Sequence, residues 1–135
     1  MYAIGRPHPL KAPSLQVLAL AVKSDVCFTD AEVFQELLHR YLGQRMWQQV
    51  GMQVADLELL FEGKTEPIFW EDVVLAGKLP DSNPALTARD LLHLAVMRRV
   101  GARYIVTADR GFDGVDEIER LDPARVEEWR GLIVN

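Results

Sequence analysis

Two aspartates in the last third of the chain stand where a carboxylate could take part in chemistry. Asp109 and Asp113 lie in a loop rich in glycine and aspartate that follows the apolar run 104–107. If that run is a strand of a parallel sheet, Asp109 comes just past its carboxyl end, where such sheets carry their active sites. The glycines at 111 and 114 allow the backbone to fold back toward a ligand. An ordinary turn aspartate, bonded to its own backbone, explains the same pattern, and both interpretations stay open.

Asp90 opens the most strongly periodic helix of the sequence, three residues after Thr87. That spacing is typical of a capping box, and a carboxylate in the first turn also complements the helix dipole. For Asp90 alone, this explanation is sufficient. Because helix starts in a doubly wound sheet lie near the strand ends, Asp90 and Asp109 could also converge on one cation.

Clustered carboxylates without cysteine or histidine partners favour a hard cation, Mg²⁺ or Mn²⁺, over zinc. The histidines do not supply a zinc site: His8 stands between prolines, His39 lies away from the apolar arc of its helix, and His93 follows two leucines. We expect each of them to be structural or solvent-facing. The sequence also has no local signature of a nucleophilic triad, a phosphate-binding loop or a dinucleotide site.

The elements that would position these acids alternate between strand and helix. Strands are predicted at residues 26–29, 67–69, 104–107 and 118–121, the third of them buried. Helices are predicted at residues 15–22, 31–42, 44–61, 70–76 and 87–101. Residues 7–13 should form a loop because of their prolines, and Ser14 and Asp30 are the expected N-caps of the first two helices. This alternation indicates an α/β fold, with helices on both faces of a parallel sheet.

Composition predicts a single domain, residues 1–135, built on one core. The 135 residues are 49% hydrophobic and 26% charged, and this length leaves no room for a second domain. A domain of this size needs neither disulfides nor a structural metal. The net charge of -5 argues against a broadly basic surface for nucleic acid, which would neutralise many phosphates. It permits a metal-bridged contact with a few phosphates.

Cysteine usage and the N-terminal residues bear on location. The single cysteine, Cys27, lies in an apolar run, cannot form an internal disulfide, and is expected to be buried as a small hydrophobe. No apolar stretch approaches the roughly 20 residues that span a bilayer, and the first residues lack the features of a signal peptide. We therefore expect a cytoplasmic protein in a reducing compartment.

Three segments in order resemble the PIN-domain family, in its toxin-ribonuclease (VapC-like) form. Residues 30–41 read DAEVFQELLHRY, residues 87–95 read TARDLLHLA, and residues 105–113 read IVTADRGFD. Each segment is moderately specific, but all three occur in the right order and at suitable separations. The resemblance covers nearly the whole chain.

The resemblance implies a three-layer α/β/α fold and a ribonuclease that depends on Mg²⁺ or Mn²⁺. Glu36, Asp90 and Asp109 then correspond to three of the family's metal-binding and catalytic acids, and Asp113 to an occasional extra metal ligand. Thr107 matches the hydroxyl residue two positions before the last acid. Helical periodicity alone places Glu36 on a solvated face, so its assignment depends on the resemblance. A homodimer and a cognate antitoxin, which blocks the acidic pocket with an Arg or Lys side chain, are also implied.

The family's remaining acid, at the end of its first strand, has no counterpart in the sequence. It stands in a motif of the form apolar-Asp-Thr/Ser-Asn, and neither Asp25 nor Asp30 can replace it because both belong to the second strand-helix unit. A start codon assigned too late, or a diverged or truncated chain, would explain this. The fold should then lack the middle strand of its sheet, and the neighbouring strands should lose hydrogen-bond partners. Activity of the chain as written is therefore in question, and a catalytically inactive PIN-like module that binds protein or RNA is the alternative.

Overall fold

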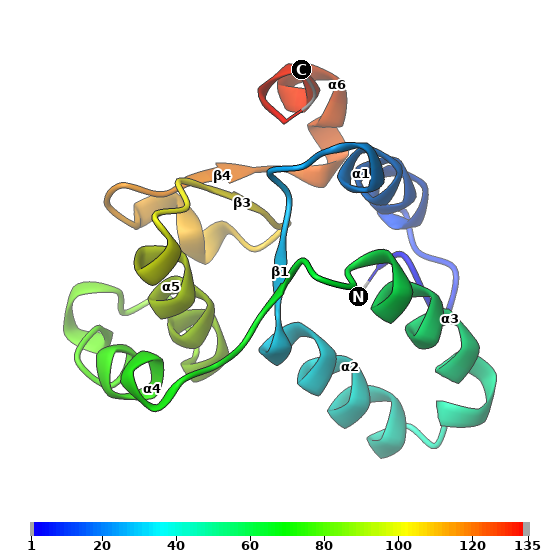
Figure 1. The fold of residues 1–135 in the computed structure, drawn as a ribbon, viewed down its shortest axis with the longest axis horizontal. Coiled ribbons are helices and arrows are strands. Elements are labelled where there is room, and N and C mark those ends of the chain that lie inside the picture. Colours follow the sequence, from blue (N-terminus) through cyan, green and yellow to red (C-terminus); the bar gives the residue numbers. More distant parts are fainter. Residues whose placement is uncertain (1, 134–135) are drawn as a thin grey trace.

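Short strands are interspersed among the helices along the chain (Figure 1). The computed structural model describes residues 2–133. The helices are α1 Lys11–Lys23, α2 Ala31–Gly43, α3 Trp47–Leu60, α4 Trp70–Ala76, α5 Ala88–Val100 and α6 Val126–Trp129. The strands are β1 Thr29–Asp30, β2 Thr65–Glu66, β3 Tyr104–Val106 and β4 Glu119–Leu121. α2 is followed directly by α3, and in the described chain there is no strand between α4 and α5. Within residues 2–133, none of the helices has the length and apolar character needed to cross a membrane.

The strands are parallel, as predicted, but they form two separate pairs. β1 pairs with β2, with Thr29 opposite Thr65, and β3 pairs with β4, with Ile105 opposite Arg120. Within the described part of the chain no strand joins the two pairs. The α/β class with parallel strands is confirmed, and the divided sheet is what the absence of a middle strand would produce.

Two predicted boundaries near the N-terminus and in the middle of the chain were wrong. α1 begins at Lys11, and Pro13 lies in its first turn, where a missing N–H costs no helical hydrogen bond. Ser14 is consequently not a cap, and its N–H donates to the Leu10 carbonyl at 2.9 Å. Residues 67–69 form no strand, because the pairing with β1 is made by β2 just before them.

Local capping signals positioned α2 and α5 correctly. Asp30 caps α2 by accepting a hydrogen bond from the Val33 N–H at 3.2 Å. Thr87 and Asp90 form the capping box of α5, which ends at Gly101. Gly101 has a φ of 72°, a left-handed conformation that favours glycine. These two helices carry Glu36 and Asp90, two of the four candidate acids.

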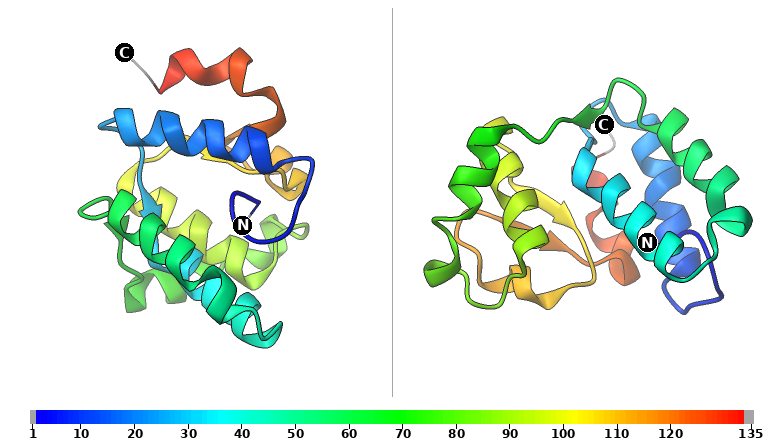
Figure 2. Two further views of the ribbon diagram at one scale, coloured as in Figure 1. Left: turned by 90° about the vertical axis from the view of Figure 1, so that its right-hand side faces the viewer. Right: turned by 90° about the horizontal axis from the view of Figure 1, so that it is seen from below.

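Buried apolar residues gather in three clusters rather than in the single core expected. The first lies between α4, α5 and the turn after β3, around Leu94 and Phe112. The second lies between α2 and α3, around Leu37, and includes Ile4. The third includes Trp129 of α6, with α1 packed against it. Figure 2 shows α1 beside α6, and α2 beside α3. Because the strand pairs are separate, no continuous sheet offers one face on which all helices could pack.

The open edges of the strand pairs leave apolar side chains exposed. Tyr104 and Val106 of β3 are 40% and 39% exposed, so the prediction that this strand is buried was wrong. Val26 and Phe28, predicted as part of a strand, precede β1 and are also exposed. Cys27 between them is half-buried rather than fully buried, and it is a free cysteine.

Candidate active site

The four candidate acids lie on α2, at the start of α5, and in the turn that follows β3. Glu36 is in the second turn of α2, and Asp90 is in the first turn of α5. Asp109 caps the short 3₁₀ turn Arg110–Gly114, which contains Asp113. The candidate acids therefore come from three segments that are far apart in the sequence.

Glu36 lies against α5 rather than in open solvent. Its side chain is 26% exposed, and its Oε1 is 3.8 Å from Nη1 of Arg89. Arg89 also approaches Glu32, with 3.6 Å between Nε and Oε1. The prediction that Glu36 lies on a solvated face holds only in part, because apolar periodicity does not register a polar contact between two helices. At these distances and exposures, each contact contributes at most about 1 kcal/mol.

Asp90 uses one carboxyl oxygen for helix capping. Its Oδ2 accepts hydrogen bonds from the N–H of Thr87 at 2.8 Å and from the Thr87 hydroxyl at 2.6 Å. The Asp90 N–H donates back to the Thr87 Oγ1 at 3.4 Å. Its Oδ1 has no hydrogen bond with any residue from 2 to 133. The capping role is confirmed, and it leaves one oxygen available for another ligand.

Asp109 is held by its own turn. Its Oδ1 accepts a hydrogen bond from the Gly111 N–H at 2.8 Å, and its N–H donates to the Thr107 Oγ1 at 3.1 Å. A Cβ at Gly111 would lie 3.1 Å from the Ala85 carbonyl oxygen, so the turn packs closely on the segment that leads into α5. The Oδ2 of Asp109 has no hydrogen-bond partner among the described residues. Asp109 is therefore an ordinary turn aspartate, and its turn also packs against the segment that leads into α5.

Asp113 forms an ion pair with Arg120. Its Oδ1 lies 2.5 Å from Nε of Arg120, and its side chain is 52% exposed. Arg120 also approaches Asp122, with 3.2 Å between Nη1 and Oδ2. The hydrogen bond to Asp113 raises the pKa of Arg120 further above its ordinary value. Of the four acids, Asp113 is the one most fully committed to an ion pair.

A histidine that sequence reasoning assigned no function lies among these acids. His93 Nδ1 is 2.7 Å from Asp30 Oδ2, and the two side chains are 15% and 8% exposed. Burial lowers the pKa of His93, but the hydrogen bond to Asp30 and the charges of Asp30, Asp90 and Glu36 together raise it above its ordinary value. Three acids from three elements therefore act on one ring. The available signal was the spacing of three residues from Asp90 to His93, which places both on one helix face.

The candidate acids suit a hard divalent cation in ligand type. Glu36, Asp90 and Asp109 each have one carboxyl oxygen without a hydrogen bond or ion pair to residues 2–133. Carboxylate oxygens are the ligands that Mg²⁺ and Mn²⁺ prefer. No three Asp, Glu, His or Cys side chains in the described chain are, however, arranged closely enough to hold a metal ion. The ligand types fit, and convergence of the three acids stays a prediction.

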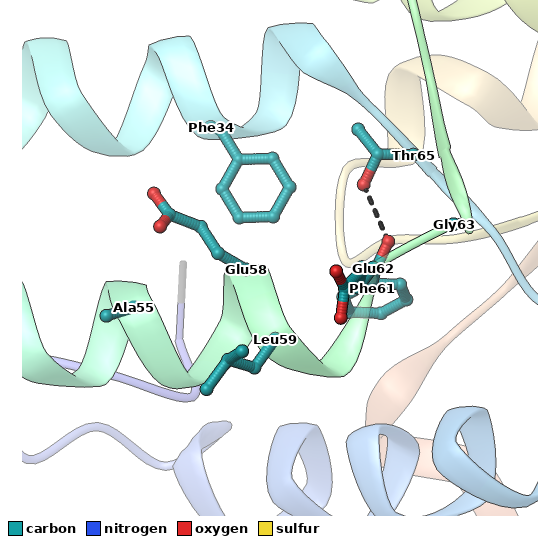
Figure 3. Close-up of a pocket in the computed structure, with 8 residues that line it drawn as sticks. All are labelled: Phe34, Ala55, Glu58, Leu59, Phe61, Glu62, Gly63 and Thr65. Atoms are coloured by element: carbon teal, nitrogen blue, oxygen red, sulfur yellow. Dashed lines mark hydrogen bonds between the residues drawn. The ribbon is translucent and has the colours of Figure 1, made fainter.

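A pocket of about 620 Å³ lies apart from these acids, between α2 and the C-terminal end of α3 (Figure 3). Phe34, Leu59 and Phe61 provide apolar surface, and Glu58 and Glu62 provide carboxylates. None of the candidate acids lines this pocket. Its position therefore has no bearing on the metal assignment.

Comparison with known proteins identifies the family to which the chain belongs. Residues 1–118 match the PIN domain, and this span contains all four candidate acids. Ribonuclease VapC23 of Mycobacterium tuberculosis is 37% identical over 110 residues, which cover 81% of this chain and 86% of the relative. VapC ribonuclease Mb1869c of Mycobacterium bovis is 34% identical over 122 residues, which cover 90% of this chain and 92% of the relative. No solved structure matches the chain. The chain thus belongs to the PIN-domain family, with its three-layer α/β/α fold.

Proposed function

We propose that the protein is a metal-dependent endoribonuclease and the toxin of a toxin–antitoxin pair. The observation that carries this proposal is the similarity to proteins named VapC ribonucleases, which extends over more than four-fifths of the chain. The matched PIN domain includes Glu36, Asp90 and Asp109. Each of these three acids keeps a free carboxyl oxygen among the described residues, as a cation ligand must.

In the proposed mechanism Glu36, Asp90 and Asp109 would hold Mg²⁺ or Mn²⁺, with Asp113 at the edge of the site. Such a cation would lower the pKa of water enough for attack near neutral pH and would offset negative charge on the scissile phosphate. The protein orients the ligands. Thr87 fixes one oxygen of Asp90, and the backbone of the turn after β3 fixes one oxygen of Asp109. In both cases the second oxygen is left for the cation.

A catalytically inactive PIN-like module that binds protein or RNA is the second candidate. The observation in its favour is that no three donor side chains in the described chain are arranged to hold a metal. The divided sheet points the same way, because within residues 2–133 no strand joins its two pairs. A misplacement of about 1 Å in such a site can cost on the order of a hundredfold in rate.

The partners proposed for the toxin follow from the similarity to VapC ribonucleases. They are an RNA substrate, an antitoxin protein and a second copy of the chain in a homodimer. An antitoxin that presents an Arg or Lys side chain would meet the carboxylates of the candidate site. A cytoplasmic location is part of the same proposal.

The test is cleavage of single-stranded RNA in Mg²⁺, Mn²⁺ or EDTA. Asp109→Asn should abolish cleavage, because asparagine keeps the acceptor for the Gly111 N–H but loses the charge. Asp116→Asn, at an exposed aspartate just after the same turn, is the matched control and should retain activity. A second form of the chain, extended by an apolar strand that ends in Asp, should cleave much faster than the chain as given.

Two results would overturn parts of this proposal. Absence of cleavage in both forms, with binding of RNA or protein retained, would favour the inactive module. Equal rates in both forms, with Asp90→Asn inactive, would show that the missing acid is not needed.

A further inference from the structure

Asp30 and His93 form a polar link between the two helices that carry candidate acids. The Oδ2 of Asp30 is 2.7 Å from Nδ1 of His93 on α5. The Oδ1 of the same carboxylate accepts the Val33 N–H at 3.2 Å and so caps α2. One nearly buried carboxylate is therefore attached to both helices at once.

The link fixes the state of the ring. An ionised carboxylate only accepts hydrogen bonds, so Nδ1 of His93 must donate to Asp30. His93 lies one turn after Asp90 on the same face of α5, and the charges of Asp90 and Glu36 both act on it. Asp30 from β1 contacts the ring, and Glu36 from α2 and Asp90 from α5 act on it through their charges.

Other contacts fix the distance between α2 and α5 only weakly. The buried residues of α2 belong to a cluster shared with α3, whereas those of α5 belong to a cluster shared with α4. Apolar packing therefore holds each helix to a different neighbour. The ion pairs of Arg89 with Glu32 and Glu36 are 3.6 and 3.8 Å long and partly exposed, and such pairs are weak. The shorter and more buried pair of Asp30 and His93 is the stronger polar tie.

We propose that His93 is a positioning residue that, through Asp30, sets the separation of Glu36 and Asp90 for a shared cation. This inference rests on the proposed function, because it concerns the same two acids. In this role His93 orients the metal ligands and does not bind the cation through Nδ1, because Nδ1 already bonds to Asp30. Partners that orient metal ligands in this way commonly change metal affinity by about 10–100-fold when they are removed.

Three substitutions separate this role from a general effect on folding. His93→Leu removes the donor at similar size. His93→Asn keeps an amide N–H close to the position of Nδ1. Asp30→Ser keeps an oxygen that can cap α2, since serine is a preferred N-cap, but it cannot reach His93. His39→Leu, at an exposed histidine of α2, is the matched control.

The experiment is a calorimetric titration of the full chain with Mn²⁺, alongside an NMR titration of the His93 ring without metal. We expect His93→Leu and Asp30→Ser to bind Mn²⁺ about 10–100-fold more weakly than the unmodified protein. His93→Asn and His39→Leu should bind nearly as tightly as the unmodified protein. In Asp30→Ser the pKa of His93 should fall, because its hydrogen-bond partner and one of three nearby charges are gone.

The outcomes separate this inference from the proposed function. Equal Mn²⁺ affinity in the unmodified protein and in His93→Leu, or in Asp30→Ser should the leucine variant not fold, would refute the positioning role alone. A loss in His93→Asn as large as in His93→Leu would also refute it, because the ring itself would then be required. An unmodified protein that neither binds Mn²⁺ nor cleaves RNA would refute the proposed function, and this inference with it.

Discussion

Asp90 is both a helix cap and a candidate cation ligand, and one substitution separates the two roles. Asp90→Asn keeps an acceptor for the Thr87 N–H, which lies 2.8 Å from Oδ2, but it removes the charge. A charge in the first turn of a helix contributes about 0.3–1 kcal/mol. For a chain of this length Tm changes by about 3–5 °C per kcal/mol. Without metal, the variant should therefore melt only about 1–5 °C below the unmodified protein.

The effect of metal should be larger than the effect of the cap. A ligand present at about 100 times its Kd stabilises the native state by about 2.7 kcal/mol, which raises Tm by about 8–13 °C. If loss of the Asp90 charge weakens Mn²⁺ binding at least tenfold, the same concentration stabilises the variant by about 1.4 kcal/mol or less. The rise in Tm with Mn²⁺ should then fall to half or below.

The assay is thermal unfolding in EDTA and in Mn²⁺ at a fixed concentration. Thr87→Val is the matched control, because it removes the capping hydroxyl, which contributes about 0.5–2 kcal/mol, and keeps both the Asp90 charge and the backbone N–H of residue 87 that fixes Asp90 Oδ2. It should lower Tm in EDTA and keep the full rise with Mn²⁺. A full rise with Mn²⁺ in Asp90→Asn would show that Asp90 is a cap and nothing more.

Three further outcomes are expected. Asp72 is 2% exposed, and its Oδ1 lies 3.0 Å from Nε of Arg99, which also pairs with Glu66, so Asp72→Asn should cost about 1–3 kcal/mol in urea unfolding, and an unchanged midpoint would contradict the pairing. Arg89→Gln removes a cation 3.8 Å from Glu36 and should tighten Mn²⁺ binding by about fivefold in a calorimetric titration, whereas weaker binding would show that Arg89 supports the site. The folded pKa of His93 is raised above 6.5, so its contribution to the free energy of unfolding is present below that pH and lost as pH rises through the folded value. Unfolding at a series of pH values should show this loss in the unmodified protein, and a step of the same size in His93→Asn would assign it to another group.

Local signals account for the parts of the fold that the sequence predicted well. α2 and α5 each have a capping residue and a glycine at or just after the last turn, and α2 also has a periodic apolar face. The buried residues of α5 include the consecutive run 94–97, so the prediction of a strongly periodic face for that helix was wrong. The position of Asp109 just past a strand followed from the order of the elements. Asp90 was predicted as a capping residue from its spacing to Thr87, and both hydrogen bonds of the box are present.

The parts that were wrong depend on contacts between distant segments. Whether β3 is buried depends on which other segments pack against it, and residues 104–106 alone do not show this. The contact of Glu36 with Arg89 and that of Asp30 with His93 each join two helices. Helical periodicity describes one helix at a time, so it cannot place such pairs. The division of the core into clusters could not be predicted for the same reason, because apolar residues on separate elements do not reveal which of them pack together.

The division of buried residues into separate clusters bears on how the molecule opens. Segments that share buried contacts tend to unfold locally as one unit, so the α2–α3 pair and the α4–α5 pair should open with different free energies in native-state hydrogen exchange. Glu36 belongs to the first unit and Asp90 to the second. A cation that needs both acids would bind only while both units are closed, and it would raise the protection of their amides together. Assembly of the site would then require the α2–α3 pair and the α4–α5 pair to dock against each other.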